Sequence, residues 1–280
     1  MNKPLNKEIY FHVGIAKTGT TFLQYRVFPK FEGIYYIQRT RYKRALKIIR
    51  AKKHARYLVS REFDLHLELA AESFSSSFPD TKPIIVFRRQ DSYIASQYRR
   101  FVKNGFTGKF TEFIDLDNDT GFFKKKYLEF FNQIQLLEKY FNPKPLVLFY
   151  EDLRSEPVTF IEKLARQLNV SINIKNVNLD KKHSSYSEKQ LKAMMSLGKY
   201  INMEKRRLFK NDFLNFFWRL YLGSIRYTTL FLAKFIPQSY FSSEPLINKS
   251  DLEKIREYYN KDWEQCIDYA KKFDKLSSSE

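Results

Sequence analysis

A loop bracketed by two glycines near the start of the chain has the residue types needed to bind an anion. The stretch Gly14 to Thr21 (GIAKTGTT) follows one apolar run and precedes an amphipathic segment. Where a loop joins a strand to a helix in this way, backbone N–H groups and the helix dipole converge on a phosphate. Lys17 adds a positive charge, and Thr18, Thr20 and Thr21 add hydroxyl donors. The loop therefore predicts a phosphate-type site, with a plain surface turn as the alternative.

The position of the lysine separates this loop from that of nucleotide triphosphatases. Their pattern is G-x-x-x-x-G-K-[ST], in which lysine directly follows the second glycine. Here Gly14 and Gly19 keep the spacing, but Thr20 stands after Gly19 and the lysine lies at Lys17. The pattern disfavours a plain ATPase, while a P-loop kinase-like phosphotransferase that uses ATP remains an alternative. From its position, Lys17 could reach an anionic bridge between two groups.

A second set of anion-binding candidates follows another apolar run, at 84–87. Arg88 and Arg89 come directly after it, and Ser96 stands eight positions after Arg88. Alone, these residues could simply cap a strand and lie on a solvated helix face. Together with the K-T-G-T-T loop, they resemble the two phosphate-binding elements of sulfotransferases that use 3′-phosphoadenosine 5′-phosphosulfate (PAPS).

The resemblance implies how PAPS, the sulfuryl donor, is bound. The family's K-[ST]-G-T-[TS] loop holds the 5′-phosphosulfate, and its matching residues here are Lys17, Thr18, Gly19, Thr20 and Thr21. The family's arginine and serine hold the 3′-phosphate, which implies Arg88 and Ser96, with Arg89 as the alternative to Arg88. Lys17 is expected to meet the charge on the leaving oxygen. No metal is expected, because the sequence shows no clustered His/Asp/Glu set.

Transfer to an acceptor hydroxyl also needs a base within hydrogen-bond reach. Glu62 follows the apolar run 57–60, which should end at the same sheet edge as the phosphate loop. Glycan sulfotransferases that resemble this chain use a glutamate in this region, so Glu62 is the expected base. A surface ion pair of Glu62 with a neighbouring arginine is the alternative. His66 and His183 are reserve candidates for the base, whereas His12 is expected to be packed inside a strand.

A third match is the sequence Y-E-D-L at 150–153, which similar sulfotransferases also carry. We expect a structural role, in which Asp152 accepts backbone N–H bonds and fixes the turn. The three motifs lie within 9–168. The first loop looks closest to that of bacterial carbohydrate sulfotransferases, which implies a saccharide, glycolipid or polysaccharide acceptor.

The elements that must position these residues alternate along the chain. Short apolar runs predict strands at 9–13, 34–37, 57–60, 84–87 and 146–150. Helical patterns lie at 21–28, 45–56, 92–103, 122–140 and 158–168. This alternation predicts an α/β fold: three layers of P-loop type with a central, mostly parallel sheet. We expect a single domain, with a cofactor-binding core at 1–170 and a mainly helical cap at 171–280.

Composition restricts the partners and the compartment. The chain has 280 residues and a net charge of +19, which favours an anionic partner. A non-catalytic nucleic-acid-binding protein is an alternative, but no DNA- or RNA-binding motif is present and no nucleic-acid partner is expected. The single cysteine excludes an intrachain disulfide. Without a signal-peptide pattern, we expect a cytoplasmic protein that could contact the inner face of the membrane.

Two further segments are unusual. Arg39 to Arg56 holds nine basic residues and no acid, which indicates a track for an anionic acceptor or a membrane surface, or else a solvated helix face. Phe213 to Ile236 is strongly apolar, but charged residues interrupt it, so it does not read as a membrane span. Core packing is the default interpretation of this segment; a dimer contact, a lid over the acceptor and a membrane interface are the alternatives.

Overall fold

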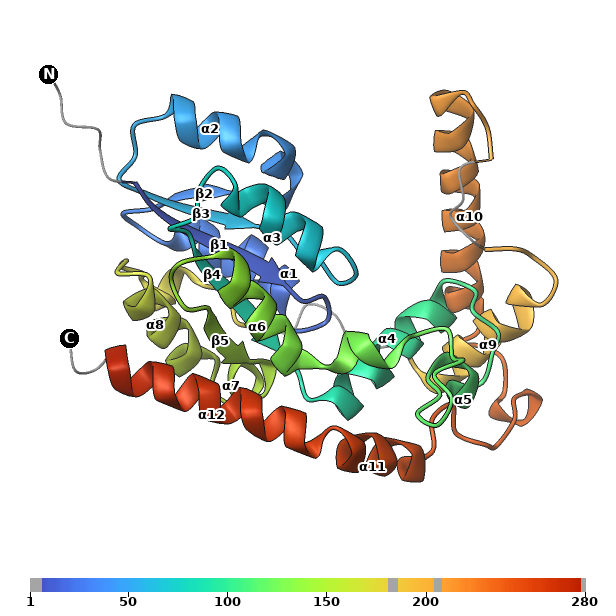
Figure 1. Cartoon of the computed structure of the whole chain (residues 1–280). Helices are drawn as coiled ribbons and strands as arrows, with labels where there is room; N and C mark the ends of the chain where they lie inside the picture. Colours follow the sequence, from blue (N-terminus) through green and yellow to red (C-terminus); the bar gives the residue numbers. More distant parts are fainter. Residues whose placement is uncertain (1–6, 181–185, 204–207, 278–280) are drawn as a thin grey trace, which may run out of the picture. The chain divides into compact units, whose positions relative to one another are not determined.

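Five parallel strands form the sheet that positions the candidate site (Figure 1). In the computed structural model they are β1 (Glu8–Gly14), β2 (Tyr35–Ile37), β3 (Arg56–Ser60), β4 (Lys82–Phe87) and β5 (Leu146–Phe149). Their spatial order is β2-β3-β1-β4-β5, and every pairing between them is parallel. The predicted α/β fold with a central parallel sheet is therefore confirmed. Because the strands are parallel, the loops that follow them meet at one edge.

The structure describes residues 7–180, 186–203 and 208–277. The chain divides into two compact units: unit 1 comprises Met1–Gln90, Lys126–Asp180 and Tyr258–Glu280, and unit 2 comprises Asp91–Lys125 and Lys181–Glu257. These boundaries do not follow the expected division at residue 170. The organisation as one domain with a helical cap stays a prediction.

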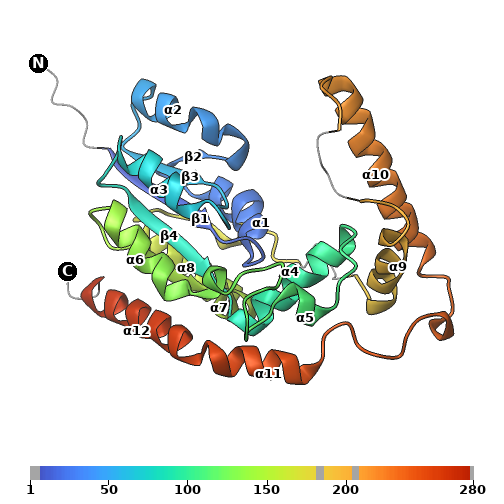
Figure 2. The same ribbon diagram turned by 45° about the vertical axis from the view of Figure 1, so that its right-hand side comes forward.

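The sheet of unit 1 is buried on both faces, which explains why the middle of each strand is mostly apolar. On one face, Tyr10, Leu58 and Ile84 pack against residues of η1 (Leu23–Val27) and of α8 (Pro157–Gln167). On the other face, Phe11 stacks on Phe74 of α3 (Leu67–Ser75), with ring centroids 4.4 Å apart. Figure 2 shows α3 and α6 (Phe130–Tyr140) lying over this second face.

The remaining helical segments of unit 1 differ in part from those expected. They are α1 (Thr20–Phe22), η2 (Phe28–Lys30), η3 (Arg39–Arg44), α2 (Ala45–Ala51), α7 (Tyr150–Ser155), η5 (Ile174–Asn176) and α12 (Asn260–Ser277). The helix predicted over 45–56 ends at Ala51, because the chain turns into β3. The helix predicted over 122–140 begins only at Phe130, after η4 (Lys125–Leu128). Helix α3 was not predicted.

Helix α12 packs on the sheet unit although it comes from the end of the chain. The Asp262 carboxylate accepts the backbone N–H groups of Phe130 and Phe131, both at 3.0 Å, and so caps α6. Burial raises the pKa of this carboxyl. Trp263 packs edge-on against Phe149 of β5, with ring centroids 4.9 Å apart. The C-terminal helix therefore packs on the edge strand β5 and on α6.

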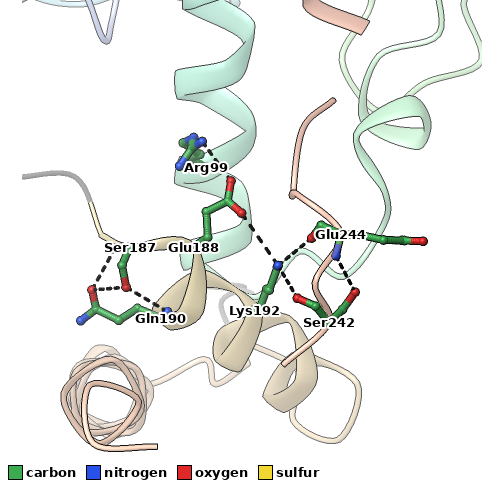
Figure 3. Close-up of polar contacts among 7 residues, drawn as sticks. All are labelled: Arg99, Ser187, Glu188, Gln190, Lys192, Ser242 and Glu244. Atoms are coloured by element: carbon green, nitrogen blue, oxygen red, sulfur yellow. Dashed lines mark hydrogen bonds and ion pairs between the residues drawn. The ribbon is translucent and has the colours of Figure 1, made fainter. Parts of the chain in front are cut away.

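Unit 2 is helical. Helix α4 (Gln90–Lys103) begins at the last residue of unit 1, and the other elements are α5 (Phe110–Phe113), α9 (Glu188–Gly198), α10 (Asp212–Leu232), η6 (Gln238–Tyr240) and α11 (Lys249–Tyr258). A capping box between Ser187 and Gln190 starts α9 (Figure 3). Further along, Lys192 donates to the carbonyls of Ser242 and Glu244, at 2.7 and 2.6 Å. These contacts fix the chain that follows α10.

Candidate functional site

The phosphate loop joins β1 to α1 at the carboxyl edge of the sheet. Gly19 caps α1 in the left-handed conformation, with φ at +83°. The loop is held from inside by the Thr18 hydroxyl, which donates to the Ile15 carbonyl at 2.6 Å. It is held from outside by Asp64, which accepts the Ala16 N–H at 2.7 Å. Lys17 stands exposed at the tip, so its ammonium group can meet a ligand.

Glu62 lies beside this loop because the strand ladder continues past the end of β3. The Arg61 and Phe63 N–H groups donate to carbonyls of β1, both at 3.0 Å. A Cβ added to Gly14 would lie 3.2 Å from the Glu62 Cα, so the two backbones are in contact. The Glu62 carboxylate accepts a hydrogen bond from the Thr20 hydroxyl. The structure thus brings Glu62 to the phosphate loop, while its role as the base stays a prediction.

The alternative of an ion pair between Glu62 and its neighbouring arginine does not describe this geometry. The Arg61 guanidinium lies over the rings of Tyr42 and Phe63, at 5.2 and 5.7 Å from their centroids. Such stacking directs the positive charge toward the aromatic faces.

Arg88 follows β4 and reaches the phosphate loop. Its Nη1 donates to the Lys17 carbonyl at 3.3 Å, and its guanidinium lies 4.7 Å from the centroid of the Tyr150 ring. The Arg89 backbone N–H donates to Glu151 at 3.0 Å. Arg88 thus contacts the loop through its side chain. Ser96 lies partly buried in α4, in unit 2, and its expected role rests on the motif.

The Y-E-D-L segment supports both phosphate elements. Glu151 accepts the N–H that follows Arg88, and the buried Leu153 packs against the phosphate loop at Gly19. Glu151 makes the backbone contact seen here, and the role expected for Asp152 stays a prediction. The expected structural role of the segment agrees with these contacts.

The Gly19–Leu153 contact leads to a prediction about stability. A Cβ at Gly19 would lie 2.5 Å from Leu153 Cδ2, and the residue has a positive φ. We expect Gly19→Ala to lower the free energy of unfolding by roughly 1–3 kcal/mol, because overpacking adds to backbone strain. Chemical denaturation measures this change.

Gly33→Ala is the matched control. Gly33 also has φ at +83°, but no heavy atom lies within 4 Å of an added Cβ, so this variant reports the strain alone. In a Leu153→Ala background, Gly19→Ala should lower the free energy of unfolding by less than it does in the wild-type protein. Equal losses for Gly19→Ala and Gly33→Ala would contradict the packing argument.

The histidines differ in their exposure to solvent. His12 is fully buried, and its Nδ1 lies 2.8 Å from the Ser60 hydroxyl. Burial lowers its pKa to about 3, so it is neutral and packed, as expected. His66 is exposed immediately before α3. His183 lies outside the described residues.

Asp64 was missed from the sequence, although it belongs to the same S-R-E-F-D segment as Glu62. Its contact with the Ala16 N–H joins residues 48 positions apart, which no local pattern reveals. The described residues contain no group of three or more His, Cys, Asp or Glu side chains that could hold a metal ion.

An α/β sheet with a glycine-bracketed anion loop, a lysine at its tip and an arginine beside it defines a phosphate-binding protein of the P-loop type. The family model described as "Sulfotransferase domain" matches residues 10–222, which is more than half of the chain. The chain therefore belongs to the sulfotransferase family, whose members take the sulfuryl group from PAPS.

Solved sulfotransferase structures are similar to the chain at low sequence identity. The sulfotransferase from Alicyclobacillus acidocaldarius is 15% identical, with a TM-score of 0.50 over 71% of this chain and 93% of that one. Mouse sulfotransferase SULT7A1, solved in complex with PAP, is also 15% identical, with a TM-score of 0.41 over 74% of this chain and 70% of that one. No curated protein sequence matches the chain.

Proposed function

We propose that the protein transfers a sulfuryl group from PAPS to a hydroxyl of a saccharide or glycan acceptor by in-line displacement. The observation that carries this proposal is the position of Glu62, which is hydrogen-bonded to Thr20 of the phosphate loop. A carboxylate beside an anion-binding loop can accept the proton of a hydroxyl that attacks the bound donor.

The donor's 5′-phosphosulfate would lie on the loop amides, with Thr21 as a hydroxyl donor. Thr20 would contribute its N–H group, because its hydroxyl donates to Glu62. Thr18 would contribute its N–H group, since its hydroxyl is bonded to the Ile15 carbonyl. Arg88 and Ser96 would hold the 3′-phosphate.

In the transfer step, the acceptor oxygen forms a bond to sulfur while the bond from sulfur to the bridging oxygen breaks. The acceptor proton goes to Glu62, and adenosine 3′,5′-bisphosphate (PAP) leaves. Lys17 neutralises the charge that develops on the bridging oxygen. Positioning and charge stabilisation are thus the main contributions of the protein.

A basic groove beside β2 supports a polar, anionic saccharide as the acceptor; it runs from η3, near the carboxyl edge of the sheet, to Lys52, which lies over the ring of Tyr35 at the start of β2. The segment that follows β2 begins at this edge, where Tyr42 of η3 lies with its ring centroid 5.1 Å from that of Phe63. Farther along, the groove has a volume of about 560 Å³ and is lined by Arg41, Arg44, Lys47, Ile48, Ala51 and Lys52. An acceptor with carboxylate or sulfate groups could lie along this groove.

Calorimetry with PAP tests the donor site. Arg88→Ala should weaken PAP binding about ten- to hundredfold, and Ser96→Ala about fivefold, because each loses a hydrogen bond to phosphate. Arg154→Ala, an exposed arginine of α7, is the control and should bind like the wild type. If ATP with magnesium bound more tightly than PAP, the kinase-like alternative would replace this proposal.

A mass-spectrometric screen tests the acceptor. Candidate saccharides, glycolipids and polysaccharides are incubated with protein and PAPS, and an added sulfonate group is sought on each. Sulfation confined to phenols or steroids would contradict the saccharide proposal while leaving the donor site intact. Binding of random DNA at moderate salt without PAP binding would favour the nucleic-acid alternative.

A further inference from the structure

The outward side of helix α10 is apolar along its whole length, the reverse of an ordinary surface helix. Exposed positions recur there at spacings of three and four residues: they are Phe213, Phe217, Leu220, Ser224, Tyr227 and Phe231. Phe216, Tyr221 and Leu232 widen the same side, and each is at least half exposed. Within 213–232, a segment that the structure describes completely, Arg219 is the only exposed charged residue. These residues are called the apolar face below.

On the opposite side, the C-terminal half of α10 packs on α9, which lies beside that end of the helix in Figure 2. Leu222 and Leu230 are buried in a cluster with Met194 of α9. Gln190 donates to the Leu230 carbonyl at 2.7 Å. Beyond the helix end, Lys189 donates to the carbonyls of Lys234 and Ile236, both at 2.9 Å. One side of the helix is thus packed against the protein. The other side is exposed, so the interpretation of 213–236 as core is wrong for that side.

The surroundings of the apolar face are basic. Among the described residues of 199–234, the exposed charged side chains are four basic ones, Lys199, Lys210, Arg219 and Lys234, and one acidic one, Asp212. Lys210, Arg219 and Lys234 are exposed near the two ends and one margin of the face. Because the whole chain carries +19, a second copy would be repelled, whereas an anionic surface would be attracted.

The composition of the apolar face also indicates the kind of partner that it binds. Most of its large side chains are aromatic, and Tyr221 and Tyr227 each combine an apolar ring with a polar tip. Such rings favour the boundary between lipid headgroups and acyl chains. No helix within 7–180, 186–203 or 208–277 is long and apolar enough to cross a membrane.

We propose that α10 docks in the plane of an anionic lipid surface. The 21 residues of the helix extend over about 30 Å, at about 1.5 Å per residue. The apolar face enters the boundary between headgroups and acyl chains, and the neighbouring lysines and arginines contact the headgroup phosphates. The inference is independent of the donor and acceptor chemistry proposed above.

Vesicle flotation tests the inference with the full chain. The wild type should float with vesicles of phosphatidylcholine and phosphatidylglycerol, bind phosphatidylcholine vesicles more weakly, and be released by high salt. The double variant Phe217→Gln/Phe231→Gln should bind the anionic vesicles at least about tenfold more weakly, because it loses two half-exposed apolar side chains. Its melting temperature should match that of the wild type, since both side chains are exposed.

The matched control removes two exposed apolar side chains elsewhere. Tyr25 in η1 and Leu69 in α3 are 56% and 66% exposed, so Tyr25→Gln/Leu69→Gln should bind vesicles like the wild type. Equal weakening in both double variants, or no flotation of the wild type, would overturn the proposal. A third result would also overturn it: a wild type that forms a dimer and does not bind vesicles, together with a Phe217→Gln/Phe231→Gln variant that is monomeric. A second copy of the chain would then cover the apolar face.

Discussion

Replacing Glu62 with glutamine should lower turnover with a saccharide acceptor by about 10²–10⁴ and leave PAP affinity unchanged. The amide keeps the size of the side chain and can still accept the Thr20 hydrogen bond, so the loop keeps its geometry. It cannot take the proton of the acceptor hydroxyl at neutral pH. Steady-state kinetics, with PAP calorimetry on the same preparation, separates the two effects.

Glu68→Gln is the control for this variant. Glu68 is an exposed glutamate in α3, and its substitution should leave turnover and PAP binding as they are. If Glu62→Gln retained nearly full turnover, the base would lie elsewhere, and His66 and His183 would be the next residues to replace.

Lys17→Ala should weaken PAPS binding and also reduce turnover, by about 10²–10³. The two losses occur together because one ammonium group faces both the bound phosphosulfate and the leaving oxygen. Alanine keeps the Cβ at this positive-φ position, so the backbone strain stays the same. Kinetics at saturating acceptor, with PAPS varied, measures both parameters.

Lys30→Ala, which removes an exposed lysine from η2, should change neither parameter. Lys17→Arg should recover part of the loss, since it keeps the charge. A loss of affinity alone in Lys17→Ala would show that this residue binds the donor without stabilising the leaving oxygen. The combined loss at Lys17 and the pure turnover loss at Glu62 thus distinguish the two roles.

The sequence predicted the sheet well because each strand has its own local pattern. Buried parallel strands are continuous apolar runs, and all five runs became strands, with ends shifted by two residues at most. The ends of helices near charged or aromatic stretches were harder to predict. In 45–56 the helical spacing continued into residues that form the turn before β3, and the tertiary contacts of β1 with β3 decided where the helix ended.

Only part of the candidate site could be predicted from the sequence. Lys17, Thr20 and Arg88 belong to motifs whose spacing is local, and the sequence therefore identified them. Asp64 and Leu153 hold the phosphate loop through contacts that arise only when distant strands align. The apolar face of α10 was recognised as apolar, but its exposure depends on how α9 packs.

The long-range contacts of the phosphate loop have a consequence for folding. Asp64 and Arg88 meet the loop from 48 and 71 positions away along the chain, and Leu153 packs on it from another strand connection. Pairings this remote form slowly, because the loss of chain entropy precedes the gain from contact. The loop thus acquires its binding shape only after β1, β3, β4 and β5 have come together. A donor that binds the finished loop selects the folded chain, so its affinity adds to the stability of the whole sheet.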